Sequence, residues 1–268
     1  MPFEHRNMSV EELFIRVEHK NIYVKKIIPK FSDDKPTIIL LHDALGSVVQ
    51  WRDFPEKLAK ELECPVICYD RPGYGLSSPG EGYLFPGYFE KEAFVVLPDL
   101  IKQMEQNDSC VILGHSDGGT IGLMYASKFG AKAVISIAAH VMVEKVTSNG
   151  VSATAKNGME IISKLEKYHG DRATVIFNDW VDIWTSEKME GWNIFPELQK
   201  IVSPVLIIQG QDDQYATSLH PQMIMEHLGA PNTCLILKNC GHFPHRETPA
   251  AVMDGIKSFM IQHDVLQT

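Results

Sequence analysis

Ser116 occupies the middle of a G-x-S-x-G motif, formed by Gly114 and Gly118 on either side of it. Residues 109–111 before the motif have strand character, and residues 120–128 after it have helical character. In that context the motif is a sharp turn that presents a serine hydroxyl, and both glycines are required because their positions pass close to neighbouring backbone. The motif alone is weak evidence. Its position between a strand and a helix predicts a nucleophilic serine.

A serine hydroxyl becomes a strong nucleophile when a base removes its proton, and the base needs a third group that fixes its tautomer. The chain offers both after later strand-like runs. Asp212 and Asp213 follow the first of these runs, and His242 follows the second. The order of serine, acid and histidine is the one that this type of turn requires. We therefore predict Ser116 as nucleophile and His242 as base, with one of the two aspartates as the acid.

The elements that position these residues alternate between strands and helices. Residues 37–41 form a continuous apolar run, which is typical of a strand buried on both faces of a parallel sheet. Other strands are expected at 12–18 and 21–28 (a hairpin), 65–69, 133–138, 204–209 and 233–237. Helices are expected at 51–63, 90–106, 220–228 and 247–263, and Pro98 suggests a kink or break in the second of these. This alternation predicts a mostly parallel sheet with helices on both faces.

The alternation stops at 141–195, a segment that is helical in pattern and rich in aromatic residues. We expect a helical insertion above the sheet, with residues 1–140 and 196–268 forming the core. The aromatic side chains have two readings. They could only pack the helices together, or Phe177, Trp180 and Trp184 could line an apolar pocket for an acyl group.

Composition narrows the class of partner. The net charge of −9, with no basic block, argues against nucleic acid and anionic membranes. Residues 1–10 lack an apolar signal region, and no apolar run is long enough to span a membrane. The odd count of five cysteines has no paired zinc spacing, which favours a reduced, cytoplasmic setting. No metal or other cofactor is expected, because no histidine pair has metal-ligand spacing.

Three further histidines, His140, His169 and His245, are expected at the surface or just outside the site, and His115 is expected beneath the serine turn. The residue after the serine, Asp117, has two open interpretations. Its carboxylate either points to solvent or lies beside the nucleophile and disfavours anionic substrates.

The motifs taken together resemble the α/β-hydrolase superfamily over nearly the whole chain, with 141–195 as a cap. The resemblance implies an α/β-hydrolase fold with a mostly parallel eight-stranded sheet. It also implies a triad of Ser116, Asp213 and His242, because Asp213 matches the family's G-x-x-D spacing. Residues 70–75 resemble the family's D-R-x-G-x-G segment, whose role there is mostly scaffolding.

The loop after the strand at 37–41 supplies a backbone N–H to the oxyanion in this superfamily. Asp43 stands where the family usually has glycine. Since the loop contributes a backbone group, we assign the two oxyanion donors to the N–H groups of Ala44 and Asp117.

The resemblance implies a serine hydrolase that cleaves a carboxylic ester or lactone of a small, acyl-bearing molecule through an acyl-enzyme. N-acyl homoserine lactones are one candidate, by family analogy alone. Thioester and C–C bond hydrolysis use the same triad. Two other readings remain, a small-molecule receptor that keeps the triad and a cofactor-free lyase. The sequence does not indicate an oligomeric state.

Overall fold

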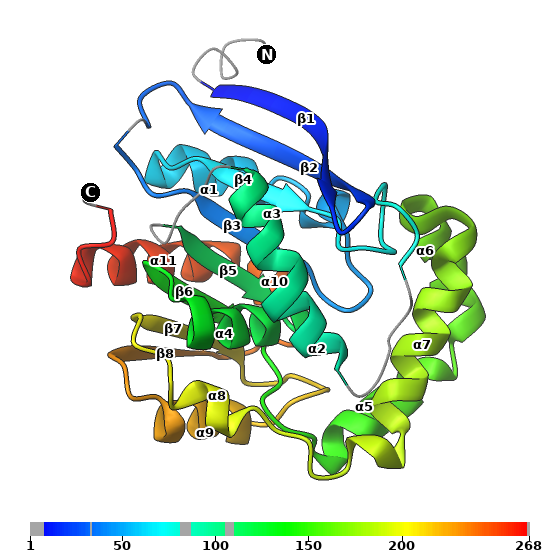
Figure 1. Ribbon diagram of the computed structural model, residues 1–268. Coiled ribbons are helices and arrows are strands. Elements are labelled where there is room, and N and C mark those ends of the chain that lie inside the picture. Colours follow the sequence, from blue (N-terminus) through cyan, green and yellow to red (C-terminus); the bar gives the residue numbers. More distant parts are fainter. Residues whose placement is uncertain (1–7, 33, 81–86, 105–109, 267–268) are drawn as a thin grey trace.

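A single sheet organises the computed structural model, which describes residues 8–32, 34–80, 87–104 and 110–266 (Figure 1). Within those residues the sheet has eight strands in the order β1-β2-β4-β3-β5-β6-β7-β8. The strands are β1 (Met8–Val17), β2 (Lys20–Pro29), β3 (Ile38–Leu41), β4 (Val66–Tyr69), β5 (Val111–His115), β6 (Ala133–Ile137), β7 (Val205–Gly210) and β8 (Asn232–Leu237).

Six neighbouring strands, from β4 to β8 in the sheet, pair in parallel, whereas β1 pairs with β2 and β2 with β4 in antiparallel fashion. The predicted mostly parallel sheet and its N-terminal hairpin are therefore confirmed. The hairpin turn has only two residues, Glu18 and His19, at φ 45° and 69°. Two positive φ angles match the right-handed twist of the paired strands.

Apolar side chains on the central strands alternate between two cores. In β3, Ile38 and Leu40 belong to one cluster of buried residues, and Ile39 and Leu41 belong to the other. A strand projects successive side chains to opposite faces, so a continuous apolar run buries both faces. In Figure 1, α3 and α4 cover the front of the sheet, while α1 and α11 lie behind it.

The helices are α1 (Phe54–Leu62), α2 (Tyr88–Lys91), α3 (Leu97–Gln103), α4 (Asp117–Phe129), α5 (Lys145–Ala155), α6 (Gly158–His169), α7 (Ala173–Thr185), α8 (Phe195–Leu198), α9 (Leu219–His227), α10 (Pro244–Glu247) and α11 (Pro249–Gln262). None of those in the described residues is both long and apolar enough to cross a membrane.

Two predicted helices are divided in the structure. A π-helical turn, Glu92–Val96, separates α2 from α3, and Pro98 falls at the start of α3. Proline has no N–H to offer the preceding turn, so the irregularity precedes it. The C-terminal helix expected at 247–263 begins as α11 at Pro249, after the short α10. Residues 105 and 106 of the other predicted helix lie outside the described residues.

The segment 141–195 contains α5, α6 and α7, which stand together at one side of the sheet (Figure 1). Its two ends are joined: Met142 and Asn193 form an isolated antiparallel bridge, and the Ile194 N–H donates to the Val141 carbonyl at 3.0 Å. Because the segment leaves the rest of the chain and rejoins it at the same point, it has the geometry of an insertion. The division into a core and a cap remains our proposal.

Two residues of helix α11 test which face of that helix packs against the sheet. Phe259 is 1% exposed and belongs to the cluster behind the sheet, whereas Ile261 on the same helix is 67% exposed. We expect Phe259→Ala to lower the free energy of unfolding by about 3–5 kcal/mol, because it removes a buried ring and leaves a cavity. Urea denaturation measures this change. Ile261→Ala is the control and should change stability by less than about 0.5 kcal/mol; equal losses in the two variants would contradict the assigned packing.

Candidate active site

Ser116 lies on the strained turn between β5 and α4, with φ 54° and ψ −119°. A positive φ is unfavourable for a residue with a side chain, and such strain concentrates at functional sites. The flanking glycines permit the turn. A Cβ on Gly114 would lie 2.0 Å from the Gly118 carbonyl oxygen, and one on Gly118 would lie 2.1 Å from the Leu41 carbonyl oxygen. No other residue fits either position.

Three side chains that are distant in sequence meet at this turn. The Ser116 hydroxyl lies 3.0 Å from His242 Nε2, and His242 Nδ1 lies 2.8 Å from Asp213 Oδ2. The carboxylate can only accept a hydrogen bond, so Nδ1 carries the proton and Nε2 is left to accept the serine proton. This is the geometry of a nucleophile, a general base and a group that orients the base.

The Asp213 carboxylate is held by four donors. Its Oδ2 accepts from Gln209 Nε2 and from His242, and its Oδ1 accepts from the backbone N–H groups of Tyr215 and Ala216. Burial alone would raise the pKa of Asp213. The nearby His242 and these hydrogen bonds outweigh that effect and lower it to about 2. The aspartate is therefore ionised wherever the imidazole is expected to work.

Asp212, the alternative acid, is exposed. Its backbone N–H donates to the Cys240 carbonyl at 2.8 Å. Of the two aspartates, the structure places Asp213 against His242. Tyr215, which the sequence analysis did not single out, follows it by two residues and packs its ring edge-on against His242, with centroids 4.9 Å apart. The sequence offered one signal for Tyr215, namely its position two residues after the predicted acid.

Buried histidines surround the triad. His115 lies beneath the turn as predicted, and its Nε2 donates to the His242 carbonyl at 2.7 Å. Burial lowers the pKa of His115 to about 4, so it is neutral at neutral pH. A surface position is wrong for His140, His169 and His245, because all three are buried. The His140 ring lies 5.8 Å from that of His242, and the His245 ring lies 4.8 Å from that of His115.

The two residues assigned to the oxyanion hole, Ala44 and Asp117, border the same cavity as Ser116 and His242. Asp117 is the first residue of α4, so its backbone N–H lies at the positive end of that helix. Its side chain is 1% exposed, which rules out the solvent-pointing interpretation.

The cavity has a volume of about 340 Å³ and lies between the triad and the segment 141–195. Trp180 and Trp184 of α7 line it, together with the apolar side chains Val151, Ile161 and Leu165 from α5 and α6. Phe177 was expected in this lining, but it is not among the residues that border the cavity.

The correction has a packing cause. The Phe177 ring fills the space left by Gly158, the first residue of α6, and lies behind Trp180 with ring centroids 5.8 Å apart. It supports the cavity wall from one turn earlier on α7. Phe177 and Trp180 are three residues apart on α7 and so lie on neighbouring positions of one helix face, and the gap at Gly158 of α6 draws the Phe177 ring away from the cavity.

Both signs of charge border the cavity. Asp43 and Asp117 lie among the residues that border it, and so do Lys164 of α6 and Arg246 of α10. Arg246 is half-buried, donates to the Gln50 carbonyl at 2.7 Å and packs over the Phe243 ring. The described residues contain no group of three or more histidine, cysteine, aspartate or glutamate side chains suited to a metal ion.

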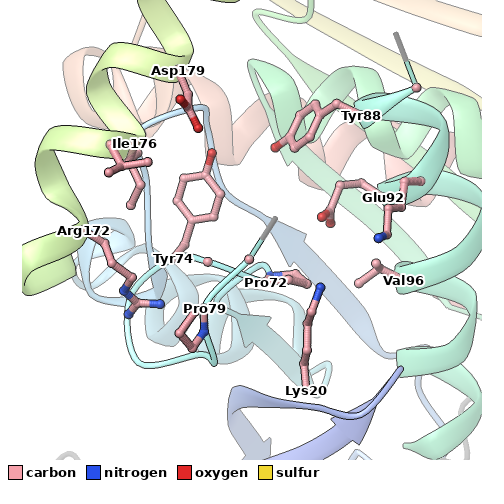
Figure 2. A pocket seen from close by; sticks show the side chains of 15 residues that line it. Lys20, Pro72, Tyr74, Pro79, Tyr88, Glu92, Val96, Arg172, Ile176 and Asp179 are labelled. Carbon is pink, nitrogen blue, oxygen red and sulfur yellow. The ribbon is translucent and has the colours of Figure 1, made fainter. Parts of the chain in front are cut away.

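A second cavity is lined in part by the loop that follows β4 (Figure 2). Tyr74, Tyr88, Glu92 and Arg172 border it, and none of the described residues that line it belongs to the triad. Figure 2 shows the Glu92 carboxylate turned inward. Among the described residues, its Oε2 has no hydrogen-bond partner. Burial raises the pKa of Glu92 to about 7.

Comparison with known proteins gives consistent matches. The model of the family described as "Alpha/beta hydrolase family" matches residues 38–254. A proline iminopeptidase of Saccharolobus solfataricus is 24% identical, over 96% of this chain and 94% of that protein. The 3-oxoadipate enol-lactonase 2 of Acinetobacter baylyi is 22% identical, over 85% and 89%. A solved enol-lactonase of Burkholderia xenovorans superposes with a TM-score of 0.69 at 17% identity, over 92% and 99%.

The buried Glu92 predicts a pH-dependent stability. Its pKa is about 7 in the fold against an ordinary value of 4.5, so the folded state binds the extra proton and stability falls as pH rises between these values. We expect Glu92→Gln to be nearly neutral at about pH 5 and to stabilise by up to about 3 kcal/mol at about pH 8.5. Urea denaturation at both pH values measures the change. Glu90→Gln, an exposed position on α2, is the control; a pH-independent effect of Glu92→Gln would contradict the prediction.

Proposed function

Because the chain belongs to the alpha/beta hydrolase family, we propose that it is a serine hydrolase that cleaves a carboxylic ester or lactone through an acyl-enzyme. The observation that carries the proposal is the continuous set of contacts from Asp213 through His242 to the hydroxyl of Ser116. The cavity beside that hydroxyl gives a small substrate access to it.

Acylation begins when Ser116 Oγ attacks the substrate carbonyl carbon while His242 Nε2 takes the hydroxyl proton. The carbonyl oxygen becomes an oxyanion, which the N–H groups of Ala44 and Asp117 stabilise. Asp213 stays ionised and stabilises the imidazolium. When the tetrahedral intermediate collapses, the bond to the leaving oxygen breaks, and His242 returns the proton to that oxygen. In a lactone the leaving alcohol remains attached to the acyl group.

Deacylation repeats these steps with water as the nucleophile. His242 Nε2 takes a proton from water, the resulting hydroxide attacks the acyl carbon, and collapse releases the carboxylic acid and returns the proton to Ser116. The energetic contribution of the site is the fixed orientation of its donors. The dipoles are in place before the charge develops, so no reorganisation is needed in the transition state.

The cavity lining suggests the type of substrate. Trp180, Trp184 and Leu165 present apolar surface opposite the serine, which suits an acyl chain on a compact molecule. An enol-lactonase among the relatives supports a lactone. N-acyl homoserine lactones fit this description by analogy with the family, and no single residue identifies them. The same triad could also hydrolyse a thioester or a C–C bond.

A second candidate is hydrolysis of an N-terminal prolyl amide. It is favoured by the relatives named proline iminopeptidase and by the acidic residue Asp43 at the border of the cavity, whose charge suits a substrate ammonium group. A receptor that retains the triad and a cofactor-free lyase remain further alternatives. Sustained turnover would exclude the receptor, and activity that survives Ser116→Ala would indicate the lyase.

The test is turnover of nitrophenyl esters of graded acyl length, N-acyl homoserine lactones and a prolyl nitroanilide. We expect hydrolysis of short or medium acyl esters or of a lactone, and labelling of Ser116 by a fluorophosphonate probe. Ser116→Ala should abolish both. If no ester or lactone is turned over and Ser116 is not labelled, the proposal is wrong. Preferential turnover of the prolyl nitroanilide would instead support hydrolysis of a prolyl amide.

The two neighbouring aspartates give a matched pair of variants. Asp213→Asn should lower kcat on the order of 10⁴-fold, because an amide favours the wrong imidazole tautomer and does not stabilise the imidazolium. Asp212→Asn should leave kcat within about 2-fold, because that exposed side chain is outside the contact to His242. Steady-state kinetics on one nitrophenyl ester compares them. A greater loss in Asp212→Asn would reassign the acid.

A further inference from the structure

We propose that Arg71 is a positioning residue of the oxyanion hole, where it fixes and polarises the peptide unit that joins Asp43 to Ala44. The inference rests on the proposed function. Resemblance gave the segment of residues 70–75 a scaffolding role, and the structure assigns its arginine a more specific one.

The carbonyl oxygen of Asp43 is the acceptor for three converging donors. Arg71 Nη2 donates to it at 2.6 Å, His42 Nδ1 at 2.8 Å and the Gly46 N–H at 3.1 Å. The His42 tautomer is settled by its other nitrogen, Nε2, which accepts the Arg71 backbone N–H at 3.1 Å. Burial and the arginine lower the pKa of His42 well below its usual range, so the ring is neutral. The Arg71 guanidinium therefore contacts this carbonyl directly, and the Arg71 backbone N–H orients the His42 ring that also donates to it.

The Asp43 carbonyl and the Ala44 N–H belong to one peptide unit. In a planar trans peptide these two groups point in opposite directions, so fixing the C=O fixes the direction of the N–H. Donors on the oxygen also withdraw electron density from the amide and strengthen its N–H as a donor. The Ala44 N–H is one of the two groups assigned to the oxyanion. The cation thus acts on the reacting oxygen through one peptide unit.

The environment of Arg71 indicates that its charge has a role. The residue is 0% exposed, and a buried guanidinium is costly unless its donors are satisfied. Its Nη1 donates to the Tyr88 hydroxyl, and its guanidinium carbon lies 4.7 Å from the centre of the Tyr74 ring. Its Nη2 donates to the main-chain carbonyl of Asp43. A residue that only filled space here would not require a charge.

Three variants separate positioning from packing. Arg71→Met keeps a long side chain but removes the side-chain donors, and it leaves the backbone N–H that donates to His42. Arg71→Lys keeps the charge with a different geometry, and Tyr88→Phe removes the hydroxyl that accepts from Nη1 while leaving the Asp43 contact. Each is assayed on the nitrophenyl ester that wild type turns over. Each is also titrated with a trifluoromethyl ketone, which forms an oxyanion on the serine, and with the matched methyl carbinol, which does not.

For Arg71→Met we expect kcat to fall by about 10- to 100-fold with KM within about 2-fold, because one oxyanion donor is weakened and not removed. The inhibition constant of the trifluoromethyl ketone should rise by the same factor as kcat/KM falls, while that of the carbinol stays constant. Arg71→Lys should recover part of both losses, and Tyr88→Phe should stay within about 3-fold of wild type.

A purely structural role would lower the melting temperature of Arg71→Met and Tyr88→Phe without selective loss of the ketone, and that result overturns the inference. A rise in KM alone, or equal weakening of ketone and carbinol, also overturns it. If Arg71→Met does not fold, Arg71→Lys is tested in its place. Its loss in kcat/KM should then equal its rise in the inhibition constant of the ketone, and unequal changes overturn the inference. Failure of the proposed function is distinguishable, because wild type would then show neither turnover nor labelling of Ser116.

Discussion

The positive-φ turn at Ser116 is the constraint on which the rest of the site depends. The turn is stabilised from the neighbouring strand, since the Ser116 N–H donates to the Ile137 carbonyl at the end of β6. Parallel pairing then aligns the carboxyl ends of β5, β6, β7 and β8 at one edge. Asp213 follows β7 and His242 follows β8. The sheet order brings three residues that are remote in sequence to one point.

The segment 141–195 is attached to the oxyanion loop by specific hydrogen bonds. His169, at the end of α6, accepts the Gly75 N–H at its Nδ1 and donates from Nε2 to the Leu45 carbonyl. The buried carboxylate of Asp70 accepts hydrogen bonds from the N–H groups of Val48 and Leu76. It therefore joins the loop that follows β3 to the loop that follows β4. The position of the helices above the cavity is thereby linked to the loop that contains Ala44. The same hydrogen bonds therefore hold both the wall of the cavity and the loop that carries the proposed oxyanion donor.

Much of the fold and the central residues could be read from the sequence, because they depend on local rules. Continuous apolar runs predicted the parallel strands, and the G-x-S-x-G pattern predicted the strained turn that presents Ser116 to His242. The choice between Asp213 and Asp212 needed a family spacing, because a loop residue's direction is not set by periodicity. The prediction that Phe177 lines the cavity was wrong for a related reason. The space beside Gly158 on the neighbouring helix α6 determines where the Phe177 ring lies. Arg71 is detectable only when the Asp43 carbonyl is seen to face it.

The histidines around the triad show why burial matters to the chemistry. Desolvation lowers the pKa of each of four rings near His242, the proposed base, namely His115, His140, His220 and His245. They are therefore neutral at neutral pH and add no positive charge, and the rings of His115 and His140 lie directly against that of His242. A charged neighbour at these distances would oppose the imidazolium of the proposed acylation step. Asp213, with its depressed pKa, supplies the compensating charge. The surroundings thus suit the proposed role of His242 as base, because its neighbours remain uncharged when it gains a proton.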